Sequence, residues 1–414
     1  MFLSAGRGGN QRASPLDIES DLFRHGTIDG DVQFDGGAGK LDYGIATKML
    51  LWNSGDMKNN KEVHSIPVHG EMDKDFNMDN RITTEQNKYV NYLIIAIVLG
   101  AVAGFSLFGH GPDYEGYRLL YEMNFDLQDY YINPLLILGR EPGYTLVTMF
   151  LHNIIKMPFE VFYWGFVFLC VAVKMVGIYK LSNAKLYSVW IYFSFFYIMH
   201  EMITIRAGAA AGIFLLSIPF LVNKKRAIYL CMIFLAMLIH YSACILLPLV
   251  FLSNDNEYPQ WYLVMLVSSF LGALFGFSLD GILYVIPINI LSVKMDVYRS
   301  LLEESPTSLN LFSRFSLPNL LLCIILLINF NKLKNYSPNA SIIIRIFAIS
   351  QIMFYGFNGL PVFSTRVSEL MGIVGIIAWP LLLYFLKTRR QQLIVFSMVG
   401  LLFISLALRV LLVS

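Results

Sequence analysis

Three ionisable side chains stand between two apolar stretches in the middle of the chain. His200, Glu201 and Arg206 fall between the apolar runs Leu186–Met199 and Ala207–Val222. A charge at the edge of a membrane is costly unless it faces a polar cavity or a partner, so such residues are functional candidates. The alternative is an arginine at a helix end whose charged group simply reaches the water.

Two further arginines, Arg314 and Arg366, also lie at the ends of apolar runs. The planar fork of arginine binds phosphate through two parallel hydrogen bonds and keeps its charge. Together with Arg206, these residues indicate a site for an anionic lipid head group, and a diphosphate fits best. The alternative is that each arginine separately pairs with a carboxylate, for example Glu201 or Glu369.

A histidine and two carboxylates are candidates for proton transfer. His240 separates two apolar runs, and neutral imidazole accepts a proton from a hydroxyl near pH 7. A structural histidine on an apolar helix face is the alternative. Asp113 and Glu141 lie in one polar stretch, close in sequence to Tyr117 and Tyr144. No cluster of ligands at helical spacing indicates a metal, and the pattern calls for no cofactor.

The composition indicates which elements must position these side chains. The chain has 414 residues, of which 56% are hydrophobic and 14% charged, against about 25% charged residues in soluble domains. We therefore predict an all-α, polytopic helical membrane protein with about ten full spans. The expected spans are 89–108, 159–179, 186–199 with its flank, 207–222, 227–239, 261–277, 309–330, 341–357, 367–386 and 393–412.

Two apolar runs, Tyr144–Ile155 and Tyr241–Leu252, are too short to cross a bilayer comfortably. We interpret them as half helices of the kind that line polar cavities. Residues 1–88 are polar, and we expect them to be disordered or to reflect a gene start placed too early. The membrane domain would then comprise residues 89–414.

Basic residues predict the orientation of the helices. Four short loops carry ten of them and should face the cytoplasm under the positive-inside rule. This orientation places the amino terminus inside and the loops 109–143 and 278–308 outside. It also places the candidate arginines and His240 at the outer face. The ten basic residues are Lys180, Lys185, Lys224, Lys225, Arg226, Lys332, Lys334, Lys387, Arg389 and Arg390.

Short motifs in a fixed order resemble the Wzy-like polysaccharide polymerases, most closely the EpsG branch. Gly111–Tyr117 followed by Glu141–Tyr144 resembles the family pattern G-x-D-x-x-x-Y … E-x-G-Y. Ile205–Ala210 resembles I-R-x-G-x-A, and Ala236–Ala243 resembles A-x-x-x-H-x-S-A. Ser364–Arg366 is a weaker match before a late helix. The resemblance extends from about residue 89 to the carboxyl terminus.

The resemblance implies a glycosyltransferase that joins oligosaccharide repeat units carried on polyprenyl diphosphate. The reaction would take place at the outer face of the bacterial cytoplasmic membrane and would yield an exopolysaccharide, O-antigen or capsule. The arginines would hold the diphosphate, and His240, Asp113 or Glu141 would act as the base. The implied partners are the lipid-linked oligosaccharide, a flippase and a chain-length regulator, with no nucleic acid. The alternatives are a lipid-linked oligosaccharide flippase or other transporter, an O-antigen ligase and a membrane acyltransferase.

Overall fold

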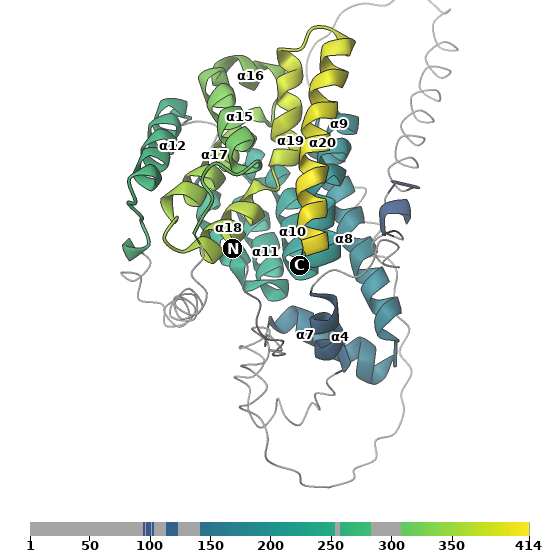
Figure 1. Cartoon of the computed structure of the whole chain (residues 1–414). Helices are drawn as coiled ribbons and strands as arrows, with labels where there is room; N and C mark the ends of the chain where they lie inside the picture. The colour runs from purple at the N-terminus through teal and green to yellow at the C-terminus, as the bar shows by residue number, and fades with distance from the viewer. Residues whose placement is uncertain are drawn as a thin grey trace, which may run out of the picture. The chain divides into compact units, whose positions relative to one another are not determined.

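The computed structural model describes residues 94–95, 97–100, 102, 113–122, 141–252, 257–282 and 308–413. Every regular element within these ranges is a helix, which confirms the all-α class (Figure 1). The polar segment 1–88 lies outside the described residues. So do most of the first predicted span and most of the loops 109–143 and 278–308.

The helices follow the apolar runs of the sequence closely, with breaks where polar residues or proline interrupt them. In chain order they are α4 (Tyr114–Glu122), α7 (Pro142–Met149), η1 (Phe150–Ile154), α8 (Phe159–Leu181), α9 (Lys185–Ile191), η2 (Tyr192–Phe196), η3 (Ile198–Ile203), α10 (Ile205–Val222), α11 (Arg226–Ile239), η4 (Tyr241–Phe251), α12 (Pro259–Leu274), α15 (Ser316–Ile328), α16 (Phe330–Tyr336), α17 (Ala340–Gly356), α18 (Pro361–Gly372), α19 (Gly375–Ala378), η5 (Trp379–Tyr384) and α20 (Arg389–Val413).

Three described helices are long and apolar enough to cross a membrane singly, namely α8, α10 and α20. The number rises to five if each of two bent pairs counts as one span. The first pair, α15 with α16, bends by 83°, and the second, Pro361–Gly372 with Gly375–Tyr384, bends by 49°. The predicted count of about ten full spans is therefore not confirmed. Several apolar runs instead form helices of 10–17 residues, which are short for a bilayer.

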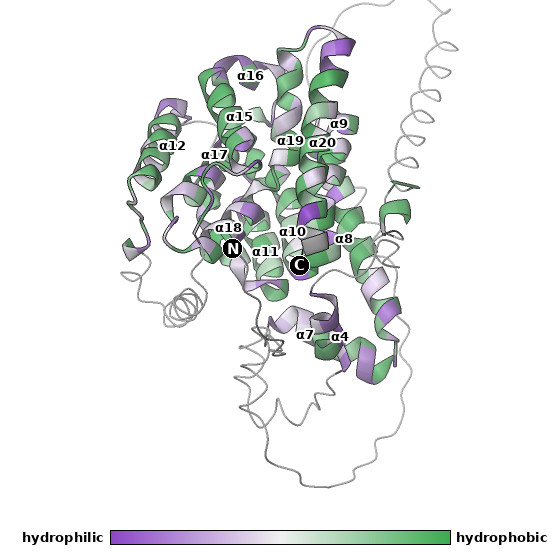
Figure 2. Ribbon diagram, viewed as in Figure 1, coloured by the Kyte–Doolittle hydropathy of each residue, from purple (hydrophilic) through white to green (hydrophobic). Residues whose placement is uncertain are grey.

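Helix α10 occupies a central place in the packing, between α8 and α11 (Figure 1). Its apolar side chains Phe214, Leu215 and Ile218 are fully buried. Helix α17 packs against α12 and α18, and α20 packs against η2 and α9. Outward-facing positions of these helices are also apolar, as Figure 2 shows, which suits a surface in contact with lipid.

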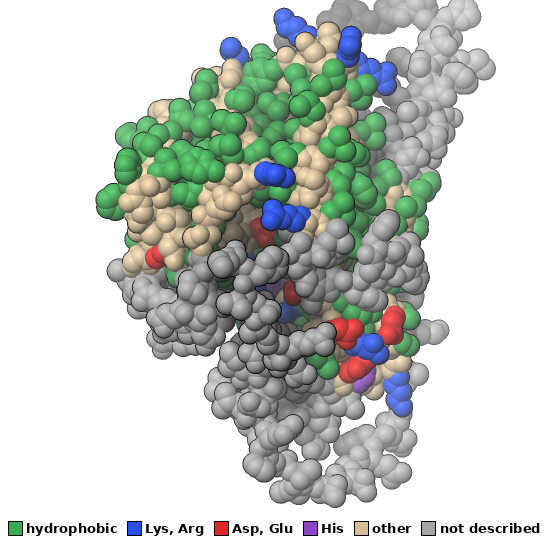
Figure 3. Space-filling model, in the orientation of Figure 1, with side chains coloured by type: hydrophobic (Ala, Val, Ile, Leu, Met, Phe, Trp, Pro, Cys, Tyr) green, Lys and Arg blue, Asp and Glu red, His purple; other side chains and the backbone are tan. Residues whose placement is uncertain are grey.

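The two ends of the helical bundle differ in charge. Figure 3 shows Lys and Arg side chains at the end that carries α16 and the start of α20. Acidic side chains gather near α4 at the opposite end with some basic ones among them, and the flank between the ends is mostly apolar, with a few Lys or Arg side chains. The positive-inside rule produces this distribution if the α16 end faces the cytoplasm. That orientation stays a prediction.

Candidate active site

One cavity, which we call the arginine cavity, brings together side chains that are far apart in the sequence. Its volume, counted as the space open to the centre of a water molecule, is about 100 Å³. A single water needs about 10–15 Å³ of such space. It is therefore large enough for several waters or for part of a ligand. Its lining residues are Asp113, Tyr117, His200, Thr204, Arg206, Ala207, His240, Ser242, Arg366, Glu369 and Leu370.

Breaks between helices place the polar residues at this cavity. Thr204 has φ −105° and ψ 65°, which separates η3 from α10 and leaves Arg206 in the first turn of α10. His240 has the extended backbone φ −151° and ψ 113° between α11 and η4. The predicted break at this histidine is confirmed, because its backbone could not continue a helix.

A close approach of two helices brings Glu141 to the same place. Glu141 precedes α7, and Pro142 occupies the first turn of that helix. A Cβ atom on Gly143 would lie 2.8 Å from both the Cβ and the carbonyl oxygen of Leu238 in α11. Only glycine allows this approach, which carries Glu141 to the end of α11 beside His240.

The carboxylate of Glu141 links Arg206 and His240. One of its oxygens, Oε2, accepts a hydrogen bond from Nη1 of Arg206 in an ion pair. The other, Oε1, lies 3.2 Å from Nδ1 of His240. Burial alone would raise the pKa of Glu141, but the bond from His240 and the charge of Arg206 together outweigh it and lower the pKa to about 2. Glu141 is thus an anion near neutral pH.

The guanidinium of Arg206 contacts two aromatic rings that also pack on each other. Its Cζ atom lies 5.5 Å from the ring centroid of Tyr117 and 5.5 Å from that of Tyr144. Both distances are within the range of cation–π attraction. Both tyrosines are buried, and the hydroxyl oxygen of Tyr144 has no hydrogen-bond partner among the described residues. The aromatic pair and Glu141 therefore position the arginine before any substrate binds.

His240 has the features expected of a proton acceptor. Burial lowers its pKa below the ordinary value, and the charges of Arg206 and Arg366 add to this, while the hydrogen bond with Glu141 opposes it. The imidazole is then neutral near pH 7. If Nδ1 carries the proton donated to Glu141, Nε2 presents a lone pair, as in other carboxylate–histidine arrangements. For Asp113, burial raises the pKa while Arg366 and Arg206 oppose the rise.

Seven of the eight residues predicted for the site lie together. Asp113, Tyr117, Arg206, His240 and Arg366 line the arginine cavity, and Glu141 and Tyr144 contact Arg206. Arg314 does not line this cavity, and its side chain is exposed at the start of α15. Its part in the site is therefore not supported by the geometry, whereas the roles of the other seven stay predictions.

The structure also corrects the expected alternative partner of Arg206. Glu201 does not pair with that arginine, because its Oε1 atom lies 2.6 Å from Nζ of Lys174 in an ion pair that is fully buried. Tyr192 donates a second hydrogen bond to the same oxygen at 2.7 Å. Arg206 pairs with Glu141 instead, and this pairing was not among the sequence-based alternatives.

Lys174 is a buried residue that the sequence did not single out. It lies within the apolar helix α8 and also donates a hydrogen bond of 2.7 Å to the carbonyl oxygen of Gly208 in α10. A Cβ on Gly208 would lie 2.5 Å from the carbonyl oxygen of His200, so this turn of α10 packs directly on η3. A lone lysine inside an apolar run was the available signal. Within the described residues, no three metal-ligating side chains lie close enough together to hold a metal ion.

Comparison with known proteins gives one match. The family model of the EpsG family matches residues 89–414, which is the whole region predicted to form the membrane domain. No curated protein and no solved structure matches the chain. Since the family model covers more than half of the sequence, the chain belongs to the EpsG family.

Proposed function

We propose that this protein is a membrane glycosyltransferase that polymerises oligosaccharide repeat units carried on polyprenyl diphosphate. The observation that carries the proposal is the meeting of Arg206, Arg366 and His240 in one cavity of an EpsG-family chain. Two arginines suit a diphosphate, and a neutral imidazole beside them suits an acceptor hydroxyl. Membrane helices around the cavity suit a substrate with a polyprenyl tail.

In the proposed reaction, a hydroxyl oxygen of one repeat unit attacks the anomeric carbon of the donor chain. The new glycosidic bond forms as the bond from that carbon to the phosphate oxygen breaks, and polyprenyl diphosphate leaves with the bonding electrons. His240 takes the proton of the attacking hydroxyl through Nε2, while Glu141 stabilises the imidazolium through Nδ1. No external energy source is required, because the diphosphate linkage supplies it.

Arg206 and Arg366 would stabilise the negative charge that develops on the leaving diphosphate. Arg366 lies on α18 and makes no hydrogen bond or ion pair with a carboxylate in the described part of the chain. It can therefore meet the incoming diphosphate first. Arg206 is already paired with Glu141, so it would have to share its charge with the ligand.

The proposed setting is the outer face of the bacterial cytoplasmic membrane, with the amino terminus in the cytoplasm. A flippase would supply the lipid-linked repeat units, and a chain-length regulator would limit the product. The polymer would be an exopolysaccharide, an O-antigen or a capsule.

The test uses the full chain in proteoliposomes with lipid-linked repeat units extracted from a strain that lacks its gene. The expected result is a ladder of polymer together with released polyprenyl diphosphate, and loss of both with Arg366→Ala at equal protein amount. Transfer of the repeat unit across the bilayer without diphosphate release would indicate a flippase instead. Transfer to a different acceptor without a ladder would indicate a ligase, and transfer of an acyl group would indicate an acyltransferase.

A further inference from the structure

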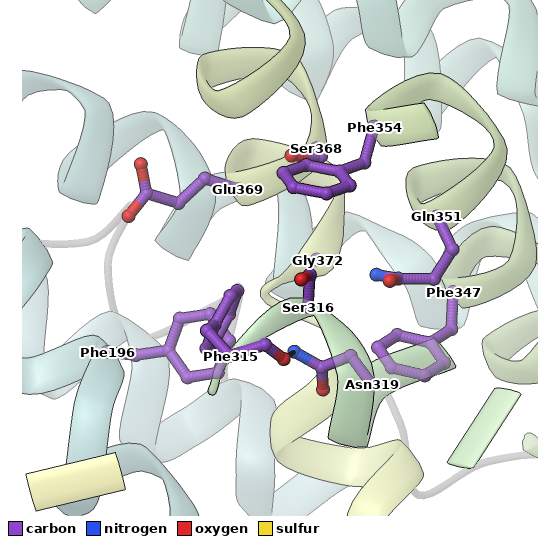
Figure 4. A pocket seen from close by; sticks show the side chains of 10 residues that line it. All are labelled: Phe196, Phe315, Ser316, Asn319, Phe347, Gln351, Phe354, Ser368, Glu369 and Gly372. Atoms are coloured by element: carbon purple, nitrogen blue, oxygen red, sulfur yellow. Dashed lines mark hydrogen bonds between the residues drawn. The ribbon is translucent and has the colours of Figure 1, made fainter. Parts of the chain in front are cut away.

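A second cavity adjoins the arginine cavity, and Glu369 lines both. We call it the phenylalanine cavity, because four phenylalanine rings form much of its wall (Figure 4). The space open to the centre of a water molecule is about 20 Å³, which is enough for about one water. Its lining residues are Phe196, Phe315, Ser316, Asn319, Phe347, Gln351, Phe354, Ser368, Glu369 and Gly372.

Glu369 stands at the boundary between the two cavities without a fixed partner. It lies on α18 one turn after Arg366, and its carboxylate makes no hydrogen bond to any described residue. Figure 4 shows its side chain extending from α18 away from Ser316 and Gln351. A carboxylate on an apolar helix of a membrane protein is costly, and residues of this kind are functional candidates.

His200 is a second polar group at the same boundary whose bonding capacity is not used. It lines the arginine cavity, is 1% exposed, and its Nδ1 atom has no hydrogen-bond partner in the described structure. Its ring packs on Phe196 with centroids 5.7 Å apart, and Phe196 lines the phenylalanine cavity. A buried ring nitrogen without a partner is unfavourable, so a ligand atom that fills the bond would be stabilised there.

We propose that Glu369 and His200 form a subsite for the acceptor sugar within the arginine cavity, beside the diphosphate position at Arg206. This inference rests on the proposed glycosyltransferase function. A sugar ring presents hydroxyl donors that suit the Glu369 side chain and a hydroxyl that suits the imidazole nitrogen of His200.

The two residues of the subsite lie on elements other than those that carry Arg206 and Glu141. Arg206 lies in the first turn of α10 and Glu141 just before α7, whereas Glu369 lies on α18 and His200 on η3. A sugar held by Glu369 would lie in the same cavity as His240, which the reaction needs for proton transfer.

The test compares two inhibitors of polymer formation in the proteoliposome assay. One is the neutral repeat-unit oligosaccharide, released from its lipid by mild acid and freed of phosphate. The other is farnesyl diphosphate, a soluble short-chain polyprenyl diphosphate. The variants are Glu369→Gln, which keeps the shape of the side chain, and His200→Phe, which keeps a ring. Thr365→Ala is the matched control, since this exposed residue on α18 bonds only within its own helix.

Glu369→Gln and His200→Phe should each raise the half-inhibitory concentration of the oligosaccharide about tenfold or more. The value for farnesyl diphosphate should stay within about twofold, and Thr365→Ala should change neither. Unchanged inhibition by the oligosaccharide in Glu369→Gln overturns the subsite, as does an equal loss for both inhibitors. A wild-type protein that forms no polymer overturns the proposed function itself, so the two failures are distinguishable.

Discussion

Removal of the Arg206 side chain should abolish most polymer formation without preventing membrane insertion. The guanidinium lies at the proposed diphosphate position, pairs with Glu141 and contacts two tyrosine rings, so it would need little reorganisation when charge develops on the leaving group. Loss of one such preorganised donor costs about 2.7–4 kcal/mol of transition-state stabilisation, or about 10²–10³-fold in rate. Arg206→Lys keeps the charge but loses the fork and most of the stacking, so partial activity should remain.

A loss of stability must be separated from this loss of catalysis. The Glu141 side chain is 13% exposed and the Arg206 side chain 24% exposed, so truncation of the arginine leaves a largely buried carboxylate with His240 alone. Breaking a fully buried ion pair costs about 3–5 kcal/mol, and the remaining bond to His240 and the partial exposure reduce this cost here. Some loss of protein from the membrane is therefore expected for Arg206→Ala.

A second substitution, at Glu141, removes the buried carboxylate that has lost its cation. The double variant Arg206→Ala with Glu141→Gln should recover the protein level of the wild type, because no buried carboxylate is left without its cation. It should not recover polymer. The assay measures the polymer ladder and the released polyprenyl diphosphate in proteoliposomes at matched protein amounts. Wild-type chain length and yield from Arg206→Ala, or full recovery of polymer in the double variant, would refute the assignment of this arginine to the diphosphate.

Three further expectations follow from the structure. Burial holds the pKa of His240 below its ordinary value of 6.5, so its imidazole is neutral above that pH. Activity should therefore persist at pH 6.5 and fall only as the pH drops through the lowered pKa. The pH–rate profile of His240→Asn should lack this fall at acid pH. Lys174→Met alone should lower the melting temperature in detergent, because the buried carboxylate of Glu201 loses its cation. Adding Glu201→Leu should restore the melting temperature. An unchanged melting temperature in the single variant would contradict the ion pair. Single cysteines at Ser308 and Thr388 should react with an impermeant reagent from opposite sides of the membrane, and labelling from one side would reject the predicted orientation.

Much of the helical structure could be predicted from the apolar runs. The boundaries of α8, α10 and α17 lie within two residues of the expected ones, because charged or polar residues end each run abruptly. The number of spans could not be predicted in this way, because hydropathy does not report bends. The run 309–330 gives a helix that begins only at Ser316 and turns by 83° into α16, and such a bend depends on tertiary contacts.

In the candidate site, too, single residues could be predicted from the sequence, whereas the contacts between them could not. Arg206, His240 and Glu141 could be singled out from residue type and position, because each interrupts or borders an apolar run. Their mutual contacts could not, since the approach of Gly143 to Leu238 depends on how α7 packs on α11. The expected alternative pairing of Arg206 with Glu201 was wrong for this reason. Glu201 lies closer to Arg206 in sequence than Glu141 does, yet it is directed to Lys174 in a helix that precedes it by 27 residues.

The pairing of Arg206 with Glu141 bears on how the cavity would favour a transition state over a bound substrate. An arginine that already has a carboxylate partner gains less from a ground-state diphosphate than a free arginine would, because part of its charge is compensated. As the glycosidic bond breaks, the charge on the leaving oxygen grows and its attraction for the arginine grows with it. In the proposed reaction His240 would take a proton at the same moment, and the imidazolium would attract the other oxygen of Glu141. The carboxylate is thus drawn toward the histidine when the arginine is drawn toward the diphosphate. Only interactions that strengthen in the transition state accelerate a reaction, and this shared carboxylate strengthens two of them together.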